Sequence, residues 1–378
     1  MSTTSVHPDL IIDLDGLDHL LRLLVDDGYE LVGPTVRDGA ISHDTIEGLS
    51  DLPTGVGEEQ APGRYRLVER GDDAVFGFAS PSDSFKHRLF PPKAHLLRIR
   101  RSDGSFVVED GDRSVPRQAF IGVRSCDLAA IEVQDRVFMA NDPPDPGYTA
   151  RREAAFVVAL NCGQAGGTCF CVSMGTGPDV RHPHDLALTE LLEDGRHEFL
   201  VEPGSPEGAE VAARLPARPA TDEDRGAARD VVETTAGQMG RVMETDGIKE
   251  ALYAAQEHPR WDDVAERCLS CTNCTLACPT CFCGTLTDET SLDGDTVDRW
   301  KRWESCFTLD HSYIHGGAVR SSTRTRYRQW LTHKVASWID QYGTSGCVGC
   351  GRCITWCPVG IDITEEVAAL RRPPEVTA

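Results

Sequence analysis

The feature that most constrains this chain of 378 residues is a pair of cysteine runs near its C-terminal end. The first run begins at Cys268 and the second ends at Cys357. Each has the spacing C-x2-C-x2-C-x3-C and is followed directly by a proline, Pro279 or Pro358. Two-residue gaps let one tight turn direct three sulfurs toward three corners of a cubane, the arrangement that binds a 4Fe–4S cluster. Two complete copies therefore predict two 4Fe–4S clusters.

The spacing also predicts which cysteines share a cluster, because the fourth cysteine of each run in a two-cluster ferredoxin ligates the other cluster. The predicted ligands of cluster 1 are Cys268, Cys271, Cys274 and Cys357. The predicted ligands of cluster 2 are Cys347, Cys350, Cys353 and Cys278. Structural zinc fits the pattern less well. A zinc site takes four ligands and does not require a third cysteine separated by two residues from a C-x2-C pair. Disulfides would need an oxidising compartment, and no signal peptide directs the chain there.

Composition excludes some classes of function. The formal net charge is −22, whereas nucleic-acid binding rests on Lys and Arg that neutralise phosphates, so no nucleic-acid partner is expected. The acidic surplus is consistent with docking to a basic face of a partner, or simply with a solvated surface. Fifteen cysteines without a secretory signal indicate metal binding in a reducing cytosol. No apolar stretch approaches the ~20 residues of a membrane span, so a cytoplasmic protein is expected.

The pattern of apolar residues predicts an α+β protein of two domains. Residues 1–245 would form a mixed α/β domain, and residues 246–378 an α-helical ferredoxin domain with two 4Fe–4S clusters. Residues 38–64 are polar and predict mostly loop, whereas residues 74–79 predict a short strand. Aromatic residues between the two cysteine runs follow mostly helical patterns, so helices are expected there.

A βα rhythm follows in the N-terminal domain. Residues 119–123 and 154–160 are short apolar segments that predict strands, and a helical pattern over 126–138 follows the first of them. Residues 185–192 predict a helix and residues 197–201 a strand. If the first two strands are parallel neighbours, their C-terminal ends form the edge where open α/β sheets bind ligands.

Four further cysteines lie at that edge or just beyond it: Cys126, Cys162, Cys169 and Cys171. Four thiolates are enough for a third 4Fe–4S cluster, and the glycines between Cys162 and Cys169 would let backbone amides approach its sulfides. The spacing C-x6-C-x-C is not a general cluster signature. Buried apolar cysteines and a redox-active thiol or disulfide pair therefore stay as alternatives.

Three more cysteines, Cys281, Cys283 and Cys306, surround the first run. The favoured interpretation is that they pack beside a cluster and tune it through S–H contacts. They could instead supply replacement ligands or a further site. The sequence contains no G-x-G-x-x-G that opens a helix, and no other nicotinamide or flavin motif.

Six stretches carry a resemblance to a known family: Gly122–Ile131, Asn161–Gly177, Asp185–Leu191, Cys278–Cys283, Tyr327–Lys334 and Gly346–Ile363. Together they resemble the iron–sulfur β subunits of soluble NAD(P)-linked nickel–iron hydrogenases (sulfhydrogenases). They equally resemble the A subunit of anaerobic sulfite reductase. The resemblance spans about residues 80–365, and it implies a cluster domain of the helical ferredoxin type.

The resemblance implies an electron relay. Its partners would be a flavin subunit that binds NAD(P)H and a terminal subunit, either a hydrogenase small subunit or a sulfite reductase subunit. Such a chain carries no catalytic residue of its own, because the clusters perform the redox step. The alternative is a stand-alone reductase with a cysteine-lined site at Cys126 and Cys162–Cys171. A zinc-stabilised interaction scaffold is a third hypothesis.

Overall fold

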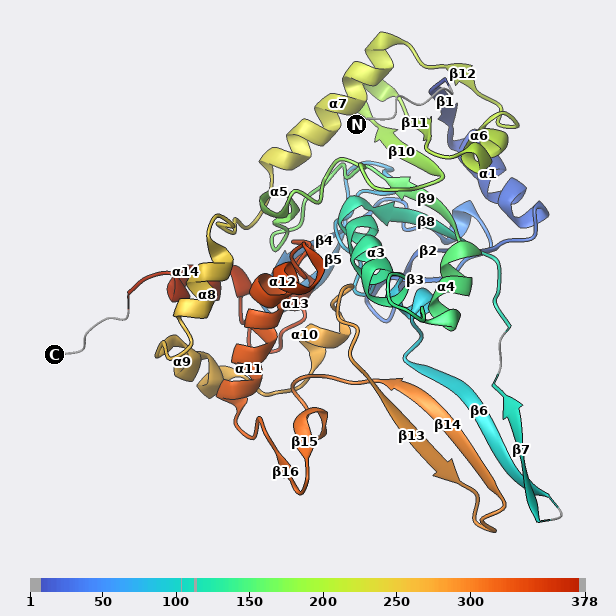
Figure 1. The fold of residues 1–378 in the computed structure, drawn as a ribbon. Helices are drawn as coiled ribbons and strands as arrows, with labels where there is room; N and C mark the ends of the chain where they lie inside the picture. Colours follow the sequence, from blue (N-terminus) through green and yellow to red (C-terminus); the bar gives the residue numbers. More distant parts are fainter. Residues whose placement is uncertain (1–7, 103, 112–113, 374–378) are drawn as a thin grey trace.

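The computed structural model describes residues 8–102, 104–111 and 114–373. Its N-terminal part is built on one eight-stranded mixed sheet with the order β12-β1-β11-β10-β9-β8-β2-β3 (Figure 1). The strands are β1 (Leu10–Asp13), β2 (Glu30–Arg37), β3 (Ala40–Thr45), β8 (Gln118–Arg124), β9 (Phe156–Leu160), β10 (Leu186–Leu191), β11 (Glu198–Pro203) and β12 (Arg218–Pro219). The four central strands, β2, β8, β9 and β10, are parallel to one another, and the outer pairings are antiparallel.

The central strands are apolar along their whole length because both faces of the sheet are covered. Every residue of β8 and β9 is buried. Val158 and Leu160 pack on the side of α1 (Leu14–Asp26) and α6 (Pro206–Ala212). Val157 and Ala159 pack on the other side, with α2 (Lys86–Leu89), α3 (Ser125–Phe138) and α4 (Pro146–Glu153). The helix α7 (Asp222–Gly237) packs against β10 and β11.

The expected helix over residues 185–192 is wrong, because this segment is strand β10. β10 pairs with β9 on one side and β11 on the other, and most of its residues are buried. A short apolar run that is buried on both faces shows no period that separates a strand from a helix. The loop expected over residues 38–64 is also wrong in part, since it contains β3 and β4 (Val56–Ala61), and β4 pairs with β5 (Arg64–Glu69).

Residues 74–79, expected as a strand, form a buried irregular segment instead. Side chains satisfy its backbone in place of a strand partner. The Glu190 carboxylate accepts hydrogen bonds from Val75 N at 2.6 Å and from Phe76 N at 2.9 Å. The buried Arg124 guanidinium donates to Phe76 O at 3.1 Å and to Phe78 O at 2.7 Å. Buried backbone groups need hydrogen-bond partners. These two charged side chains supply them, so the segment can be buried without pairing to a neighbouring strand.

The C-terminal part is mainly helical around the two cysteine runs (Figure 1). Its helices are α8 (Ile248–Ala254), α9 (Arg260–Arg267), α10 (Asn273–Leu276), α11 (Thr323–Thr332), α12 (Trp338–Tyr342), α13 (Arg352–Thr355) and α14 (Ile363–Leu370). A π-helical turn, His333–Ser337, joins α11 to α12. Trp261, Leu252, Leu331 and Ile354 are among the fully buried residues of one apolar core that also includes Cys347.

The expectation of helices between the two runs is wrong for its first half. β13 (Gly284–Thr290) and β14 (Thr296–Trp303) form an antiparallel hairpin there, followed by a short hairpin of β15 (Tyr313–Ile314) and β16 (Gly317–Ala318). β14 also pairs with β6 (Lys93–Ser102), which pairs with β7 (Ser105–Asp110). This four-stranded sheet, here called the arm, stands away from the body of the molecule (Figure 1). Alternating apolar residues in β6 and β7 are typical of strands, but the pairing of β6 with β14, about 200 positions along the chain, is not visible in either segment alone.

The arm joins segments from both sides of residue 245, so the division into domains 1–245 and 246–378 remains a prediction. That boundary falls in the irregular segment between α7 and α8. In the described part of the chain, no helix has both the length and the apolar character that crossing a membrane requires.

A buried ion pair fastens the second cysteine run to the sheet domain. The Arg352 guanidinium donates to both carboxylate oxygens of Asp127 on α3, at 2.6 and 2.8 Å. It also donates through Nε to Pro81 O at 2.9 Å. Both charged side chains are at most 2% exposed. Because a bidentate pair fixes distance and orientation together, it sets the position of α3 relative to the loop that contains Cys350 and Cys353.

We expect Asp127→Asn to lower the free energy of unfolding by about 3–5 kcal/mol, because it leaves a buried guanidinium without its anion. The double variant Asp127→Leu with Arg352→Met should lose less, since apolar replacement of both partners removes both desolvation penalties. Anaerobic urea unfolding of the reconstituted protein measures both effects. Asp295→Asn is the control, because the pair of Asp295 with Arg101, at 3.9 Å, is exposed and worth about 0–1 kcal/mol. Equal midpoints for Asp127→Asn and the control would contradict the expectation.

Candidate metal centres

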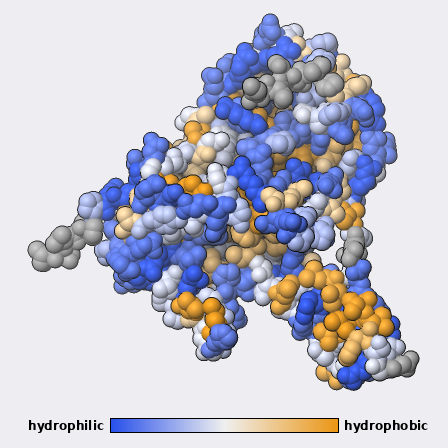
Figure 2. Space-filling view, in the orientation of Figure 1, coloured by the Kyte–Doolittle hydropathy of each residue, from blue (hydrophilic) through white to orange (hydrophobic). Residues whose placement is uncertain are grey.

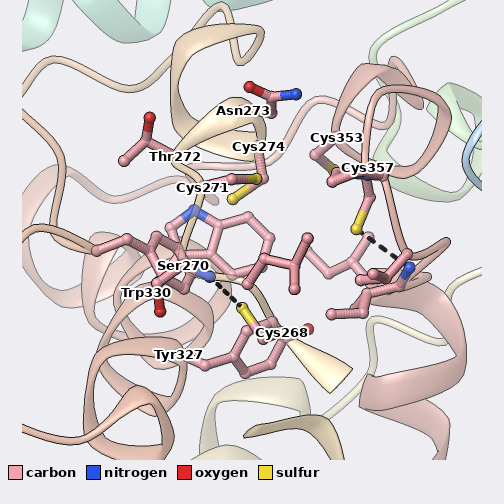
Figure 3. A pocket seen from close by; sticks show the side chains of 16 residues that line it. Cys268, Ser270, Cys271, Thr272, Asn273, Cys274, Tyr327, Trp330, Cys353 and Cys357 are labelled. Atoms are coloured by element: carbon pink, nitrogen blue, oxygen red, sulfur yellow. Dashed lines mark hydrogen bonds between the residues drawn. The ribbon is translucent and has the colours of Figure 1, made fainter. Parts of the chain in front are cut away.

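Cysteines from both runs line one cavity. Cys268, Cys271 and Cys274 of the first run face it together with Cys357, the last cysteine of the second run (Figure 3). Cys353 also borders it. The cavity encloses about 470 Å³ that protein atoms do not fill, part of it open to solvent. Its walls include the side chains of Phe307, Tyr327, Trp330, Ile361 and Ile363. An apolar chamber with thiols at its rim suits a bound 4Fe–4S cluster, whose sulfides need shielding from water.

Both cysteine runs make the same backbone turns. In the first run, Ser270 and Thr272 have positive φ angles of 52° and 71°. The corresponding residues of the second run, Gly349 and Gly351, have φ angles of 67° and 77°. This left-handed conformation is uncommon for residues with a side chain and persists only where the surroundings impose it. The repeated pattern turns three successive sulfurs toward one side of each loop.

Glycine is needed in the second run for a further reason. A Cβ on Gly349 would lie 2.6 Å from Cys171 N, and one on Gly351 would lie 2.5 Å from Thr168 O. Phe170 N donates a hydrogen bond to Gly349 O at 2.8 Å. The second run is therefore in backbone contact with the segment that contains Cys169 and Cys171. The first run carries Ser and Thr at the same positions.

The pKa shifts of the first set show which of its thiols are close enough to influence one another. Burial raises the pKa of Cys274 well above its usual range, and the nearby Cys306, Cys268, Cys357 and Cys271 add to that rise. Burial also raises the pKa of Cys268, with Cys357 and Cys271 as further causes. Four thiolates cannot share an apolar chamber unless a cation compensates them, and coordination to iron deprotonates thiols in this way. Backbone N–H groups also point at two sulfurs, Ser270 N at Cys268 Sγ (3.5 Å) and Ile361 N at Cys357 Sγ (3.3 Å).

The second set brings Cys278 of the first run to the first three cysteines of the second run. Burial raises the pKa of Cys353 well above its usual range, with Cys347, Cys350 and Cys278 as the next causes. Burial raises the pKa of Cys347 to about 12, while the Lys334 ammonium opposes the rise. Lys334 Nζ donates to Cys278 Sγ at 3.1 Å, and this ammonium, together with a hydrogen bond from Cys281, lowers the pKa of Cys278. The crossed arrangement of the two sets is the one that the cluster assignment requires, and the individual ligands remain predictions.

The third set lies at the C-terminal edge of the sheet. Cys126 is in the first turn of α3, directly after β8, and Cys162 follows β9, which is parallel to β8. Cys169 and Cys171 border the short helix α5 (Cys171–Met174). Burial raises the pKa of Cys171, with Cys162, Cys169 and Cys350 as further causes. The four thiols therefore gather beside Cys350 of the second set, as a third cluster would require, and that cluster stays a prediction.

The thiols of each set lie around a space and do not point at one common position. Among the described residues, no group of three or more His, Cys, Asp or Glu side chains is close enough to hold a single metal ion. A tetrahedral zinc site draws all of its ligands within about 2.0–2.3 Å of one ion. In a cubane each thiolate binds a different iron, so the ligands stand farther apart. The spacing of the cysteines consequently disfavours the zinc scaffold.

Two cationic residues of these centres were not identified from the sequence. Arg352 lies inside the second run, so its place beside the ligands could have been predicted from its position alone. Lys86 could not, because its ammonium donates to Leu276 O at 3.1 Å across 190 positions of sequence. No local pattern marks a lysine that reaches its site only through tertiary packing.

Comparisons with known proteins support bound 4Fe–4S clusters. A family model described as a 4Fe-4S dicluster domain matches residues 267–361. The chain is 32% identical over 326 residues to the Sulfhydrogenase 2 subunit beta of Pyrococcus furiosus. The matched region covers 84% of this chain and 93% of that protein. No solved structure matches the chain.

We expect Cys162→Ala to lower the iron content of the reconstituted protein by about four atoms per chain, because one of four cluster ligands is lost. Acid-labile sulfide should fall in parallel, and both quantities can be measured by chemical analysis after anaerobic reconstitution. Val172→Ala is the matched control, since Val172 lies exposed in the same segment and its side chain cannot bind iron. Unchanged iron and sulfide in Cys162→Ala would mean that the third set is structural.

Proposed function

The chain belongs to the family of sulfhydrogenase β subunits, and on that premise we propose that it relays electrons within a multi-subunit oxidoreductase. The relay would connect a subunit that binds flavin and NAD(P)H with a subunit that carries a terminal hydrogenase or sulfur-reducing site. The 4Fe–4S dicluster domain makes it an iron–sulfur protein of the electron-transfer class. Each bound cluster supplies a centre that accepts and releases single electrons, and this chain's residues hold the clusters and set their environment.

The observation that carries the proposal is the continuity of the three thiol sets. Cys353 borders the cavity of the first set while its thiol neighbours belong to the second set. Cys350, in the second set, packs against Cys126 and Cys171 of the third. The second set therefore adjoins both the first set and the third. A row of adjacent redox centres is what an electron relay needs.

At least one end of this row reaches the surface. Cys271 is exposed, and the neighbouring Leu269 is 63% exposed. An electron donor or acceptor bound there would approach the first set without crossing the protein. The third set, at the opposite end of the row, includes the half-buried Cys162. Entry and exit of electrons at opposite ends of the row would fit a subunit placed between two partners.

The arm supports a role as a subunit. Its register places Ile99 opposite both Val108 and Val297, and Leu97 and Phe106 lie on the same face by the two-residue period of strands. The other face carries ion pairs, such as Arg98 with Asp298. A sheet with one apolar face normally buries that face against a second layer. Phe106 and Val108 are instead 67% and 63% exposed, and Figure 2 shows hydrophobic residues gathered over the arm. We propose that another subunit of the complex supplies the missing layer.

The alternative of a stand-alone reductase has less support. Cys126, Cys169 and Cys171 are each only 6% exposed, so a substrate could not reach these sulfurs without movement of the surrounding backbone. We expect the choice of NAD or NADP and of the terminal acceptor to be made in the partner subunits, because this sequence contains no nicotinamide or flavin fingerprint. The cytoplasm stays the predicted location, since fifteen free thiols suit a reducing compartment.

Cys350→Ala should remove about four irons per chain and interrupt electron flow through the complex. In the assembled complex we expect NAD(P)H-linked hydrogenase activity to fall by at least tenfold. Reduction of the flavin by NAD(P)H, and hydrogenase activity with an artificial dye, should persist because neither passes through the relay. Glu365→Ala, an exposed position just beyond the second run, serves as control. Full NAD(P)H-linked activity in Cys350→Ala would exclude the relay.

A charge on the apolar face of the arm should prevent assembly. We expect Val108→Asp to weaken co-purification with the partner subunits at least tenfold, because an unpaired carboxylate would be buried in the contact. Val107→Asp is the matched control, since Val107 is the next residue, is 40% exposed and points to the opposite, polar face. Both variants should keep the iron content of the isolated chain. Equal assembly by the two variants would show that this face is not the contact.

A further inference from the structure

We infer that Cys281, Cys283 and Cys306 hold a further 4Fe–4S cluster, in addition to those of the three thiol sets above, which it would adjoin. These three cysteines line a second cavity together with Lys334 and His333 of the π-helical turn (η4). The cavity encloses about 360 Å³ that protein atoms do not fill, part of it open to solvent. The inference concerns only what this chain binds, and it does not depend on the relay or on its partners.

The arm brings the three cysteines together. The register of β13 with β14 places Gly284 opposite Trp303. Cys283 and Glu304 continue that pairing, since Glu304 N donates to Cys283 O at 2.9 Å. Cys281 precedes the hairpin and Cys306 follows it, so closing the hairpin closes the site. Burial raises the pKa of Cys306 to about 12, and the Cys283 thiol adds to that rise.

Two buried lysines require an anion at this place. Lys86 and Lys334 are 3% and 5% exposed, although lysine is almost never buried without a charged partner. Lys334 Nζ donates to Cys278 Sγ at 3.1 Å, Thr280 Oγ1 at 3.2 Å and Gly346 O at 3.2 Å. Lys86 Nζ donates to two backbone carbonyls and lies 3.9 Å from the ring centroid of Trp303.

Neither ammonium forms a salt bridge with a carboxylate in the described part of the chain. The anions that most favour the charged form of Lys86 are the thiolates of Cys281, Cys278 and Cys283. Lys334 contacts Cys278, so the cluster predicted on the second set would balance that ammonium. A cluster bound to Cys281 and Cys283 would balance Lys86, because an iron–sulfur cluster with thiolate ligands carries net negative charge.

A repeated tetrapeptide supports the same conclusion. Thr168–Cys171 and Thr280–Cys283 both read Thr-Cys-Phe-Cys, and the first copy supplies two thiols of the third set. Both copies contact the loop of the second run. Phe170 N donates to Gly349 O at 2.8 Å, and Thr280 Oγ1 donates to Gly346 O at 2.6 Å. The two copies thus flank this loop, each presenting a pair of thiols beside a cavity or a thiol set.

No cysteine is left for the fourth corner, because the other twelve cysteines of the sequence belong to the three sets. The fourth iron of this cluster would therefore face a side chain other than cysteine. Glu304 and His333 both line the cavity. Burial lowers the pKa of His333, which keeps its imidazole neutral and able to bind metal. A π-helical turn at this point is typical of functional sites in helices.

The test is iron and acid-labile sulfide per chain in the full-length protein after anaerobic reconstitution. We expect about sixteen irons if this site is filled beside three other clusters, and Cys283→Ser and Cys306→Ser should each lose about four irons and one electron paramagnetic resonance signal. Ser291→Ala, at the tip of the same hairpin, should keep both. Unchanged iron, sulfide and spectra in the two Cys→Ser variants would overturn the proposal. Loss of one zinc atom without sulfide would overturn it as well.

A second variant keeps the test decisive if the Cys→Ser proteins fail to fold. Lys86→Met keeps the length of the side chain and removes one buried cation. With an anionic cluster on Cys281 and Cys283, it should move two reduction potentials to more negative values, that of the further cluster and that of the cluster on Cys278, because Lys86 is near all three thiols. With empty thiols, it should move only the potential of the cluster on Cys278 and raise the unfolding midpoint, because an unbalanced buried charge disappears. The second result would overturn the proposal even when no cysteine is changed.

Discussion

The buried pair of Arg352 with Asp127 is the constraint on which the arrangement of the centres depends. Asp127 is the neighbour of Cys126 on α3, and Arg352 lies between Cys350 and Cys353 of the second run. A bidentate contact between them fixes the third thiol set against the second. Burying two charges costs more than an apolar contact of equal size, so the pair is weak evidence for stability. Its physical contribution is position, because a guanidinium fork and a carboxylate meet in one geometry.

Buried cations lie beside the thiols although the chain as a whole is acidic. The chain has a formal net charge of −22, yet its few lysines include two that are buried beside the thiols, Lys86 and Lys334. Thiolates in apolar surroundings need compensation, and a fixed cation within hydrogen-bond distance provides it without moving. Such contacts to cluster ligands also tune the potential of the cluster. The net acidic charge of the chain suits docking to basic faces of other subunits.

The base of the arm positions cysteines of the centres, and the rest of the arm offers a surface for another subunit. At its base, the pairing of β13 with β14 gathers Cys283 and Cys306, and Trp303 Nε1 donates to Phe90 O at 2.9 Å to hold that base to the body. Toward its tip, the same sheet exposes an apolar face with nothing described against it. One element therefore links the environment of the thiols to the surface where another subunit would bind. If the arm moved when another subunit bound, Cys283 and Cys306 at its base would be the first cysteines to change position.

The sequence by itself determined the features that are local. Cysteine spacing determined the turns of both runs, and apolar strands followed by Cys126 and Cys162 determined an edge where thiols collect. Three things were decided only by tertiary structure: the strand β10, the arm, and the place of Lys86 beside Cys281. A ligand spacing is a property of eleven consecutive residues, so it can be recognised before folding. Strand pairing and a buried cation join residues about 200 positions apart, and their energy exists only once the chain has brought them together.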